Sequence, residues 1–592
     1  MKIKILYLLT VSIIILASCT QHDFDHKDIT IPELQEHIDY LASDELKGRF
    51  PGTEGDIRSA EYIRDALESF GLKPAVNDGL QEFEIRAKVE AGKNNELKIN
   101  GRAVSPGYFT PLAFSGSDSL KSNVVFAGYG FDIESDTLTW KDYDNIDVEG
   151  KWVMILRADP EIDNASSHFA RVSADRDKVM LAKDKGAAGV LLVSGESFDS
   201  ADEFESLARN EYSTGIPVFR IKRNVANSIL DEKNVSISKL EEKLNKTYSP
   251  ASFELDLIAE GIAELTEQRL TTHNVLMTLP GNDPVLKEEY VIIGGHYDHL
   301  GMGGQGSSSR AQDTVAVHYG ADDNASGIAS MLEIAERFAY TKGNARSIIF
   351  AGFGAEEMGL LGSKYLADNM PVEPESINAM INLDMVGRFK ESRVLQVGGV
   401  GTSDRFRHII AEYADTSVFS LSLSEEGYGP SDHSSFYGKD IPVLFFSTGA
   451  HLDYHTPYDK ADRINYAGLV QISELVYDIS EELAGSNEKL IFSEAGPDAP
   501  GGRAMRGRGV TLGIMPDFAG EVKNGLRADF VSPGRPAALG GMIKGDIITG
   551  INGKPVNNIQ DYMFRLSKLQ AGETIQVEIL RDDKKELLLI AL

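Results

Sequence analysis

The chain of 592 residues contains one cysteine, Cys19, so it cannot form an intrachain disulfide. Its stability must therefore come from packing and polar contacts. Basic residues are also scarce, because 59 lysines and arginines stand against 90 aspartates and glutamates, for a formal net charge of −31. Since a phosphate surface would repel such a chain, we expect neither nucleic acid nor anionic lipid as a partner.

The N-terminal segment differs in composition from the rest of the chain. Residues 5–16 form an apolar run behind two lysines, and the run ends in the letters LASC. It is too short for a comfortable membrane span and is typical of a secretory signal. The ending resembles a bacterial lipobox, which implies that residues 1–18 are removed and that Cys19 carries lipid. An ordinary signal peptide with an incidental cysteine is the alternative. We therefore expect an exported protein, anchored through this lipid to a bacterial membrane on its periplasmic or cell-surface face.

Four short apolar runs predict buried strands, and each is followed by side chains that can bind a metal ion. The four runs are residues 291–293, 346–353, 379–383 and 441–447. The side chains that follow them are, in chain order, His296, Asp298 and His299; Glu356 and Glu357; Asp384; and His455. One such coincidence carries little weight, but four in succession predict a site at one edge of an α/β sheet.

Two adjacent acids, Asp322 and Asp323, precede a helical pattern over residues 326–340. Taken alone, they could simply cap that helix. With the histidines and carboxylates above, and no cysteine nearby, they suit zinc. The excess of carboxylates suggests two ions that share a bridging carboxylate, with a spare glutamate as base. We interpret His299 and His318 as solvent-exposed or supporting residues, not as ligands.

The motifs HYDH, GADDNASG, AEEMG, NLDMVG and HTPYD occur in this order between residues 272 and 483. They resemble the motifs of the co-catalytic zinc exopeptidases of metallopeptidase family 28. The resemblance implies an α/β fold, with a mixed central sheet flanked by helices, and two Zn²⁺ per chain. It also implies the site residues: His296 and Asp384 for one zinc, Glu357 and His455 for the other, Asp323 as the bridge and Glu356 as the general base.

The same resemblance places further residues around the metals. Asp298 would orient His296. His433, in GPSDHSSF, would line the substrate pocket. Tyr428 is a candidate hydrogen-bond donor to the tetrahedral intermediate, although it lies one position away from the corresponding tyrosine of the aminopeptidases.

Two further modules accompany the peptidase pattern. Residues 115–254 resemble a protease-associated domain, which we interpret as a β-rich lid or gating insert. Residues 509–592 resemble a bacterial PDZ domain, a small β-barrel-like module whose carboxylate-binding loop would be Leu512-Gly513-Ile514, so a peptide C-terminus is a candidate partner. A purely structural PDZ domain is the alternative. For the rest of the chain we predict a tether over residues 19–30 and a linker over residues 488–508. The peptidase domain would comprise residues 31–114 and 255–487.

These patterns predict an exported zinc aminopeptidase that acts on peptides. The nearest enzymatic alternative is a carboxypeptidase of the glutamate type, in which Arg388, four residues past Asp384, would hold a substrate carboxylate. A glutaminyl cyclase is disfavoured because that activity uses a single zinc. The alternative from another class is a non-catalytic, receptor-like binding protein, against which the complete metal-ligand set argues.

Overall fold

The computed structural model describes residues 28–135, 137–162, 164, 167–205, 207, 211–305, 307–495, 510–517, 522 and 524–592. The predicted signal segment, the lipid-bearing Cys19 and most of the predicted linker lie outside these residues. No helix within the described ranges has both the length and the apolar character needed to cross a membrane.

A mixed nine-stranded sheet forms the centre of the largest unit. Four of its strands are parallel neighbours, in the order β15, β14, β16, β19. They are β14 (Tyr290–His296), β15 (Ser347–Phe353), β16 (Ile377–Leu383) and β19 (Val443–Ser447). The others are β1 (Lys73–Pro74), β2 (Leu80–Ala91), β13 (Leu265–Leu279), β17 (Val394–Gly398) and β18 (Ser420–Leu423). Several of these pair antiparallel, so the predicted mixed sheet is confirmed.

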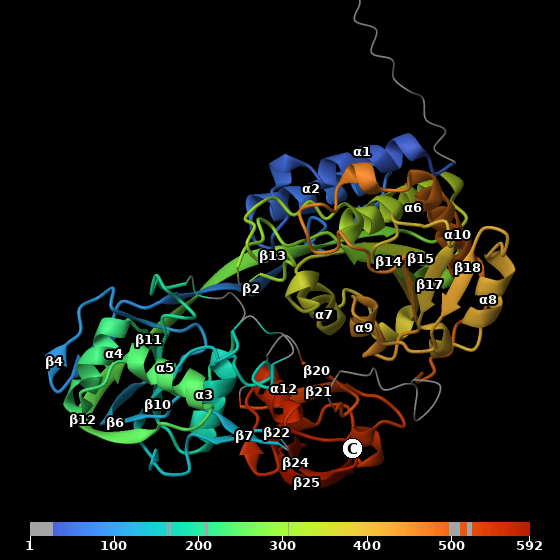
Figure 1. Cartoon of the computed structure of the whole chain (residues 1–592). Helices are drawn as coiled ribbons and strands as arrows, with labels where there is room; N and C mark the ends of the chain where they lie inside the picture. The colour runs from blue at the N-terminus through green and yellow to red at the C-terminus, as the bar shows by residue number, and fades with distance from the viewer. Residues whose placement is uncertain are drawn as a thin grey trace, which may run out of the picture.

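Helices cover both faces of this sheet (Figure 1). They are α1 (Ile31–Leu41), α2 (Glu54–Ser69), α6 (Gly327–Thr341), α7 (Leu361–Asp368), α8 (Phe406–Tyr413), α9 (His433–Tyr437) and α10 (Tyr466–Gly485). Successive residues of a strand point to opposite faces. Val291 and Ile293 therefore pack with α1, α2, α6 and α10, whereas Ile292 packs with α7 and α9. Burial on both faces explains the unbroken apolar runs in the sequence.

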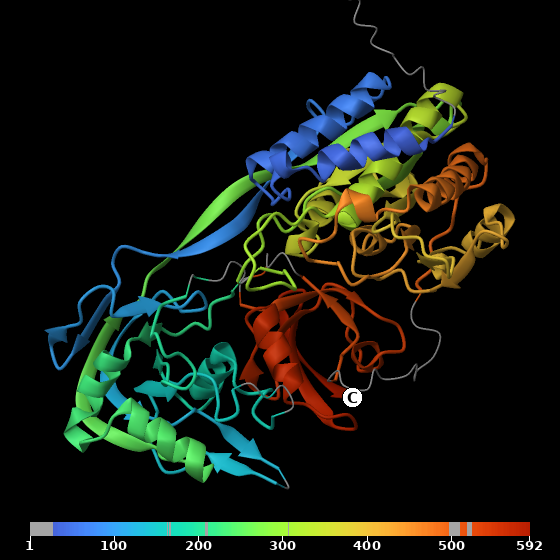
Figure 2. The same ribbon diagram turned by 45° about the horizontal axis from the view of Figure 1, so that its top comes forward.

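A long two-stranded arm joins the central sheet to the insert (Figures 1 and 2). It is the antiparallel pair of β2 and β13, which carries the chain out and back. The insert holds an eight-stranded sheet made of β3 (Glu96–Ile99), β4 (Arg102–Ala103), β5 (Phe109–Pro111), β6 (Ser119–Phe126), β9 (Trp152–Leu156), β10 (Gly189–Val193), β11 (Val218–Ile221) and β12 (Phe253–Ile262). Its helices are α3 (Asp175–Asp184), α4 (Arg223–Leu230) and α5 (Ile237–Thr247). This sheet extends beyond the predicted 115–254 at both ends, because β12 pairs with β3 as well as with β6.

The C-terminal domain is a small six-stranded β structure with its own core. Its strands are β20 (Ile514–Pro516), β21 (Leu526–Val531), β22 (Ile547–Ile551), β23 (Lys554–Pro555), β24 (Thr574–Arg581) and β25 (Lys584–Ala591). Two helices, α11 (Pro536–Leu539) and α12 (Ile559–Ser567), complete it. Alternate residues of β24, such as Ile575, Val577 and Ile579, fill the core.

Buried ion pairs connect the C-terminal domain to both other units. Lys364 of α7 binds Asp517 and Asp529, the latter at 2.8 Å from Nζ. On the insert side, Arg176 Nη2 lies 2.8 Å from Asp561 Oδ1. Asp517 and Asp561 are almost fully buried. Because a buried carboxylate is costly without its cation, these pairs hold the domain in one position.

Lys364→Ala should release the C-terminal domain from the peptidase unit. The change withdraws the cation that neutralises Asp517 and Asp529, and breaking a buried pair from one side typically costs about 3–5 kcal/mol. We expect a lower midpoint of thermal unfolding and a larger radius of gyration in X-ray scattering. Lys439→Ala, which breaks an exposed pair with Asp368, is the control and should change neither quantity. An unchanged radius of gyration in the Lys364 variant would show that docking does not depend on this contact.

Candidate active site

The candidate site lies at the carboxyl ends of the parallel strands of the central sheet. His296 is the last residue of β14, and Asp384 directly follows β16. Glu356 and Glu357 begin a short 3₁₀ turn, η5 (Glu356–Met358), that follows β15. Because these strands are parallel neighbours, their ends open at the same edge of the sheet, where α/β proteins bind ligands.

Two groups of imidazole and carboxylate atoms meet at Asp323. Its Oδ1 lies 3.2 Å from His296 Nε2, and its Oδ2 lies 3.3 Å from His455 Nε2. Asp384 Oδ1 lies 3.5 Å from His296 Nε2, and Glu357 Oε2 lies 3.1 Å from His455 Nε2. The structure thus brings the five predicted ligands together, with one shared carboxylate between the two histidines.

The spacing and burial of these atoms fit divalent cations. In a tetrahedral zinc site with bonds of about 2.0–2.2 Å, neighbouring ligand atoms lie about 3.3–3.6 Å apart, close to the distances found here. Asp323 Oδ2 and Asp384 Oδ1 are buried and have no hydrogen-bond partner among the described residues. Since an uncompensated buried carboxylate is costly, the donor set suits a cation on each side of Asp323.

His299 lies inside the site, where it is fully buried. Its Nδ1 is 2.7 Å from Glu357 Oε1 and 3.7 Å from Asp323 Oδ2. The shorter distance is that of a hydrogen bond and is too small for two atoms that share one zinc. His299 therefore holds the Glu357 carboxylate from the side opposite His455. His318 is also buried, and its Nε2 hydrogen-bonds the hydroxyl of Ser309. Neither histidine is solvent-exposed.

Asp298 supports the catalytic turn more directly than it supports His296. Its carboxylate accepts the backbone N–H groups of Glu356 at 2.9 Å and Glu357 at 3.3 Å. Its Oδ1 lies 3.8 Å from His296 Nδ1, beyond hydrogen-bond distance, whereas the Asp298 carbonyl lies 3.2 Å from that nitrogen. Asp298 therefore contacts His296 through its carbonyl oxygen, while its carboxylate binds the two amides.

Two residues that the sequence analysis missed hold the loops of the site. Asp459, buried at the end of the HTPYD motif, accepts the N–H groups of Asp322 at 2.9 Å and Asp323 at 3.0 Å with Oδ2. Arg49, also buried, donates to the carbonyls of Tyr297 at 2.6 Å and Gly320 at 3.0 Å. The position of Asp459 in the motif could have revealed its role. No local signal marks Arg49.

Glu356 occupies the place expected of a base. Its Oε2 lies 3.9 Å from His296 Nε2, farther than the predicted ligand atoms. Burial raises the pKa of the Glu356 carboxyl well above the usual glutamate value, and nearby Asp432 and Glu357 raise it further. Asp432 is fully buried and was not singled out, although it stands beside His433 in the sequence. A carboxyl of raised pKa can both accept and return a proton near neutral pH.

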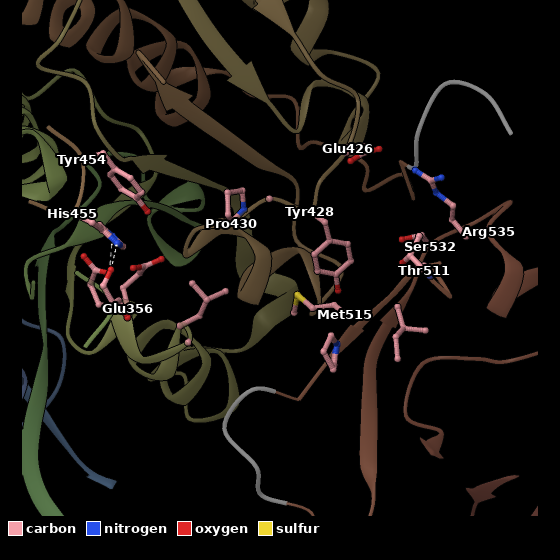
Figure 3. Close-up of a pocket in the computed structure, with 18 residues that line it drawn as sticks. Glu356, Glu426, Tyr428, Pro430, Tyr454, His455, Thr511, Met515, Ser532 and Arg535 are labelled. Carbon is pink, nitrogen blue, oxygen red and sulfur yellow. Dashed lines mark hydrogen bonds and ion pairs between the residues drawn. The ribbon is translucent and has the colours of Figure 1, made fainter. Parts of the chain in front are cut away.

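A cavity of about 530 Å³ opens beside the two glutamates (Figure 3). Tyr428 lines it, as does Tyr454, which the sequence analysis missed. The Tyr428 hydroxyl has no hydrogen-bond partner among the described residues. Tyr454 stacks on His455, with ring centroids 3.8 Å apart. Tyr454 therefore lies beside the candidate reaction centre, whereas the Tyr428 hydroxyl is buried farther along the cavity wall.

The two other predicted pocket residues lie apart from the cavity. The His433 ring stacks on the Phe445 ring, with centroids 4.6 Å apart. Its Nε2 lies against Gly429, where an added Cβ would be only 2.6 Å away. Burial lowers the pKa of His433 to about 3, so its ring is neutral. Arg388 Nη2 lies 2.7 Å from Asp453 Oδ2, which engages its charge within the protein.

Three segments of the chain match known families. Residues 274–480 match the family described as Peptidase family M28, residues 110–229 match the PA domain, and residues 519–592 match the PDZ domain. The first segment contains every predicted metal ligand. The second lies within the eight-stranded insert, and the third covers most of the C-terminal domain.

Individual proteins and solved structures match different shares of the chain. "Aminopeptidase YwaD" of Bacillus subtilis (strain 168) is 25% identical over 442 residues, which are 73% of this chain and 81% of that protein. "Leupeptin-inactivating enzyme 1" of Streptomyces exfoliatus is 30% identical over 189 residues, 31% of this chain and 38% of that protein. "Probable zinc metalloprotease" of Pyrenophora teres f. teres is 42% identical over 117 residues, 20% and 23% of the two chains. Among solved structures, the "Aminopeptidase from Aneurinibacillus sp. strain AM-1" covers 79% of this chain and 97% of its own at 22% identity, with a TM-score of 0.47.

The two histidines near Glu357 should differ in their effect on metal content. His455→Ala should lose about one equivalent of divalent metal, because its Nε2 faces both Asp323 and Glu357 at ligand spacing. His299→Ala should keep the full content, because it acts through a hydrogen bond. Elemental analysis after dialysis against zinc-containing buffer measures both. Full content in the His455 variant together with loss in the His299 variant would exchange the two assignments.

Proposed function

We propose that the protein is an exported zinc aminopeptidase, because residues 274–480 match peptidase family M28 and other segments match a PA domain and a PDZ domain. Its reaction is the hydrolytic removal of residues from the free N-terminus of peptides. One observation carries the proposal: two imidazole–carboxylate groups share Asp323, and Glu356 lies beside them at the wall of a cavity. The aminopeptidase relatives support this choice of reaction.

We assign two zinc ions to the site. His296 and Asp384 would hold one, Glu357 and His455 the other, and Asp323 would bridge them. Bound there, zinc would acidify a water molecule and polarise the scissile carbonyl. The distances between the donor atoms, 3.1–3.5 Å, support this assignment.

Glu356 is the proposed general base. It accepts a proton from the attacking water and then returns it to the leaving amine. The position of the Glu356 carboxyl supports this role, since it lies at the cavity wall beside the donor atoms without being one of the closest of them. The amides that bind Asp298 fix the turn that carries it. Tyr454, stacked on His455, supplies a hydroxyl that can donate to the oxyanion as the carbonyl is attacked.

The chemistry of the site supports the two alternatives, a carboxypeptidase and a non-catalytic binding protein, less well than it supports an aminopeptidase. A carboxypeptidase of the glutamate type would use Arg388 to hold the substrate carboxylate, but this guanidinium is paired with Asp453. A receptor-like binding protein would not need a complete ligand set with a base of raised pKa. We propose further that Cys19 carries a lipid anchor. The catalytic domain is formed by residues 31–91 and 265–487, because β3, β4, β5 and β12 belong to the sheet of the insert and not to the central sheet.

The reaction is tested with leucine p-nitroanilide, N-acetyl-leucine p-nitroanilide and an N-acetylated peptide with a free C-terminus. We expect hydrolysis of the first only, and loss of that activity on chelation, because the free amine and the metal are both required. Release of a C-terminal residue from the acetylated peptide would instead support the carboxypeptidase. No chelator-sensitive turnover of any of the three would favour the binding protein.

Glu356→Gln should lower kcat by about 10²- to 10⁴-fold, the range for loss of a general base, while the zinc content stays unchanged. Steady-state kinetics and elemental analysis measure the two quantities. Glu412→Gln, at an exposed position of α8, is the control and should behave as the unaltered protein does. Wild-type kcat in the Glu356 variant would remove this residue as the base.

A further inference from the structure

The cavity beside the metal site is shared by two domains (Figure 3). At one end it is lined by the catalytic-domain residues Glu356, Glu357 and His455. Farther along it is lined by residues of the C-terminal domain, with Arg535 and Ser532 at the far end and Met515 between the two ends. The C-terminal domain therefore forms a wall of the proposed active-site cavity.

The far end of the cavity presents a positive charge. Arg535 is half-buried, and among the described residues no carboxylate forms an ion pair with its guanidinium and no acceptor forms a hydrogen bond with it. Thr511 and Ser532 line the same cavity. Glu426 lines the same cavity without reaching ion-pair distance from Arg535. A half-buried guanidinium without a counter-charge suits a carboxylate, which it can bind through two hydrogen bonds.

The backbone of the Leu512–Ile514 loop lies close to the Arg535 side chain. Gly513 has φ +75°, and a Cβ at this position would lie 2.2 Å from Arg535 Cβ. Only glycine fits there, so the Leu512–Ile514 backbone lies directly against the arginine. The loop leads into β20, the edge strand of the C-terminal sheet.

The wall between the two ends is largely apolar and firmly placed. Leu360, Tyr428 and Met515 line it. The Tyr428 ring packs on Phe530 of the C-terminal domain, with centroids 4.2 Å apart. Lys364, which binds that domain, stands on α7, the helix that follows the catalytic turn. The two charged ends of the cavity are thus held at a fixed separation by direct contacts.

The size of the cavity indicates a short ligand. Its volume of about 530 Å³ lies in the range of about 300–1,000 Å³ that is typical of small-ligand sites. An extended chain advances about 3.3–3.6 Å per residue, so such a cavity holds a few residues and no folded structure. Glu356 and Glu357 at one end suit the amine of a short peptide, and the Arg535 guanidinium, which forms no ion pair with Glu426 on its side of the cavity, suits the carboxylate.

We propose that Arg535 and the Leu512–Ile514 loop bind the C-terminal carboxylate of short peptides whose amino end lies at the metal site. The C-terminal domain thereby selects substrates by their length and by their free C-terminus. The inference rests on the proposed aminopeptidase function. Each cycle consumes one water and releases one amino acid and a peptide one residue shorter, so the product reaches Arg535 less well than its parent.

The test uses peptides of two to eight residues with N-terminal leucine, each as the free acid and as the C-terminal amide. For the best length, amidation should lower kcat/KM by about ten- to a hundredfold, the range for loss of a hydrogen bond to a charged group. Arg535→Ala should bring the ratio of acid to amide close to one, and Arg535→Lys should restore part of it, because the charge remains. Lys585→Ala, exposed on β25, is the control and should keep the wild-type ratio.

A binding measurement separates recognition from turnover. Calorimetric titration of Glu356→Gln with the best acid and its amide should give tighter binding of the acid, and the double variant with Arg535→Ala should bind both equally. Equal kcat/KM for acid and amide at every length in the wild-type protein would overturn the inference, as would an acid-to-amide ratio unaffected by Arg535→Ala. If that variant fails to fold in a thermal-unfolding assay, the wild-type comparison and Arg535→Lys decide. Absence of leucine p-nitroanilide hydrolysis would instead reject the proposed function.

Discussion

The structure depends on the burial of several carboxylates within a few ångströms of one another. Asp323, Asp384, Glu356 and Glu357 converge at one edge of the central sheet, and their side chains are between 4% and 12% exposed. Carboxylates so close repel one another, and burial removes the water that would screen them. The cluster is tolerable only if imidazoles, backbone amides and bound cations compensate it. This need for compensating positive groups explains why the imidazoles of His296, His299 and His455 all face these carboxylates.

The compensation comes from residues far apart in the chain. Asp298 and Asp459 each bind two backbone amides and so fix the turns that carry the ligands. Arg49 ties carbonyls of the segments around Tyr297 and Gly320 to the N-terminal part of the catalytic unit. The parallel strands supply the rigid base from which all these loops leave. Geometry at the proposed zinc ions is thus a property of the whole catalytic unit.

The C-terminal domain extends this organisation beyond the catalytic unit. Lys364 stands on the helix after the catalytic turn and binds two carboxylates of that domain. The same helix therefore links the position of the base to the far wall of the cavity. A PDZ-type loop placed in this way would act, as we propose, on the peptides that enter the active site.

The sequence by itself determined the α/β class and the order of the motifs, and its resemblance to metallopeptidase family 28 implied the set of ligands. It did so because buried parallel strands are unbroken apolar runs, and functional side chains follow their ends at once. Only the tertiary structure decided the burial of His299, the binding of amides by Asp298, the pairing of Arg388 and the placement of Arg535 on the cavity. Arg49 and Tyr297 illustrate the physical reason, since they are 248 positions apart and meet through a side chain and a carbonyl. Such contacts depend on how loops and domains pack, and no local periodicity in the sequence records them.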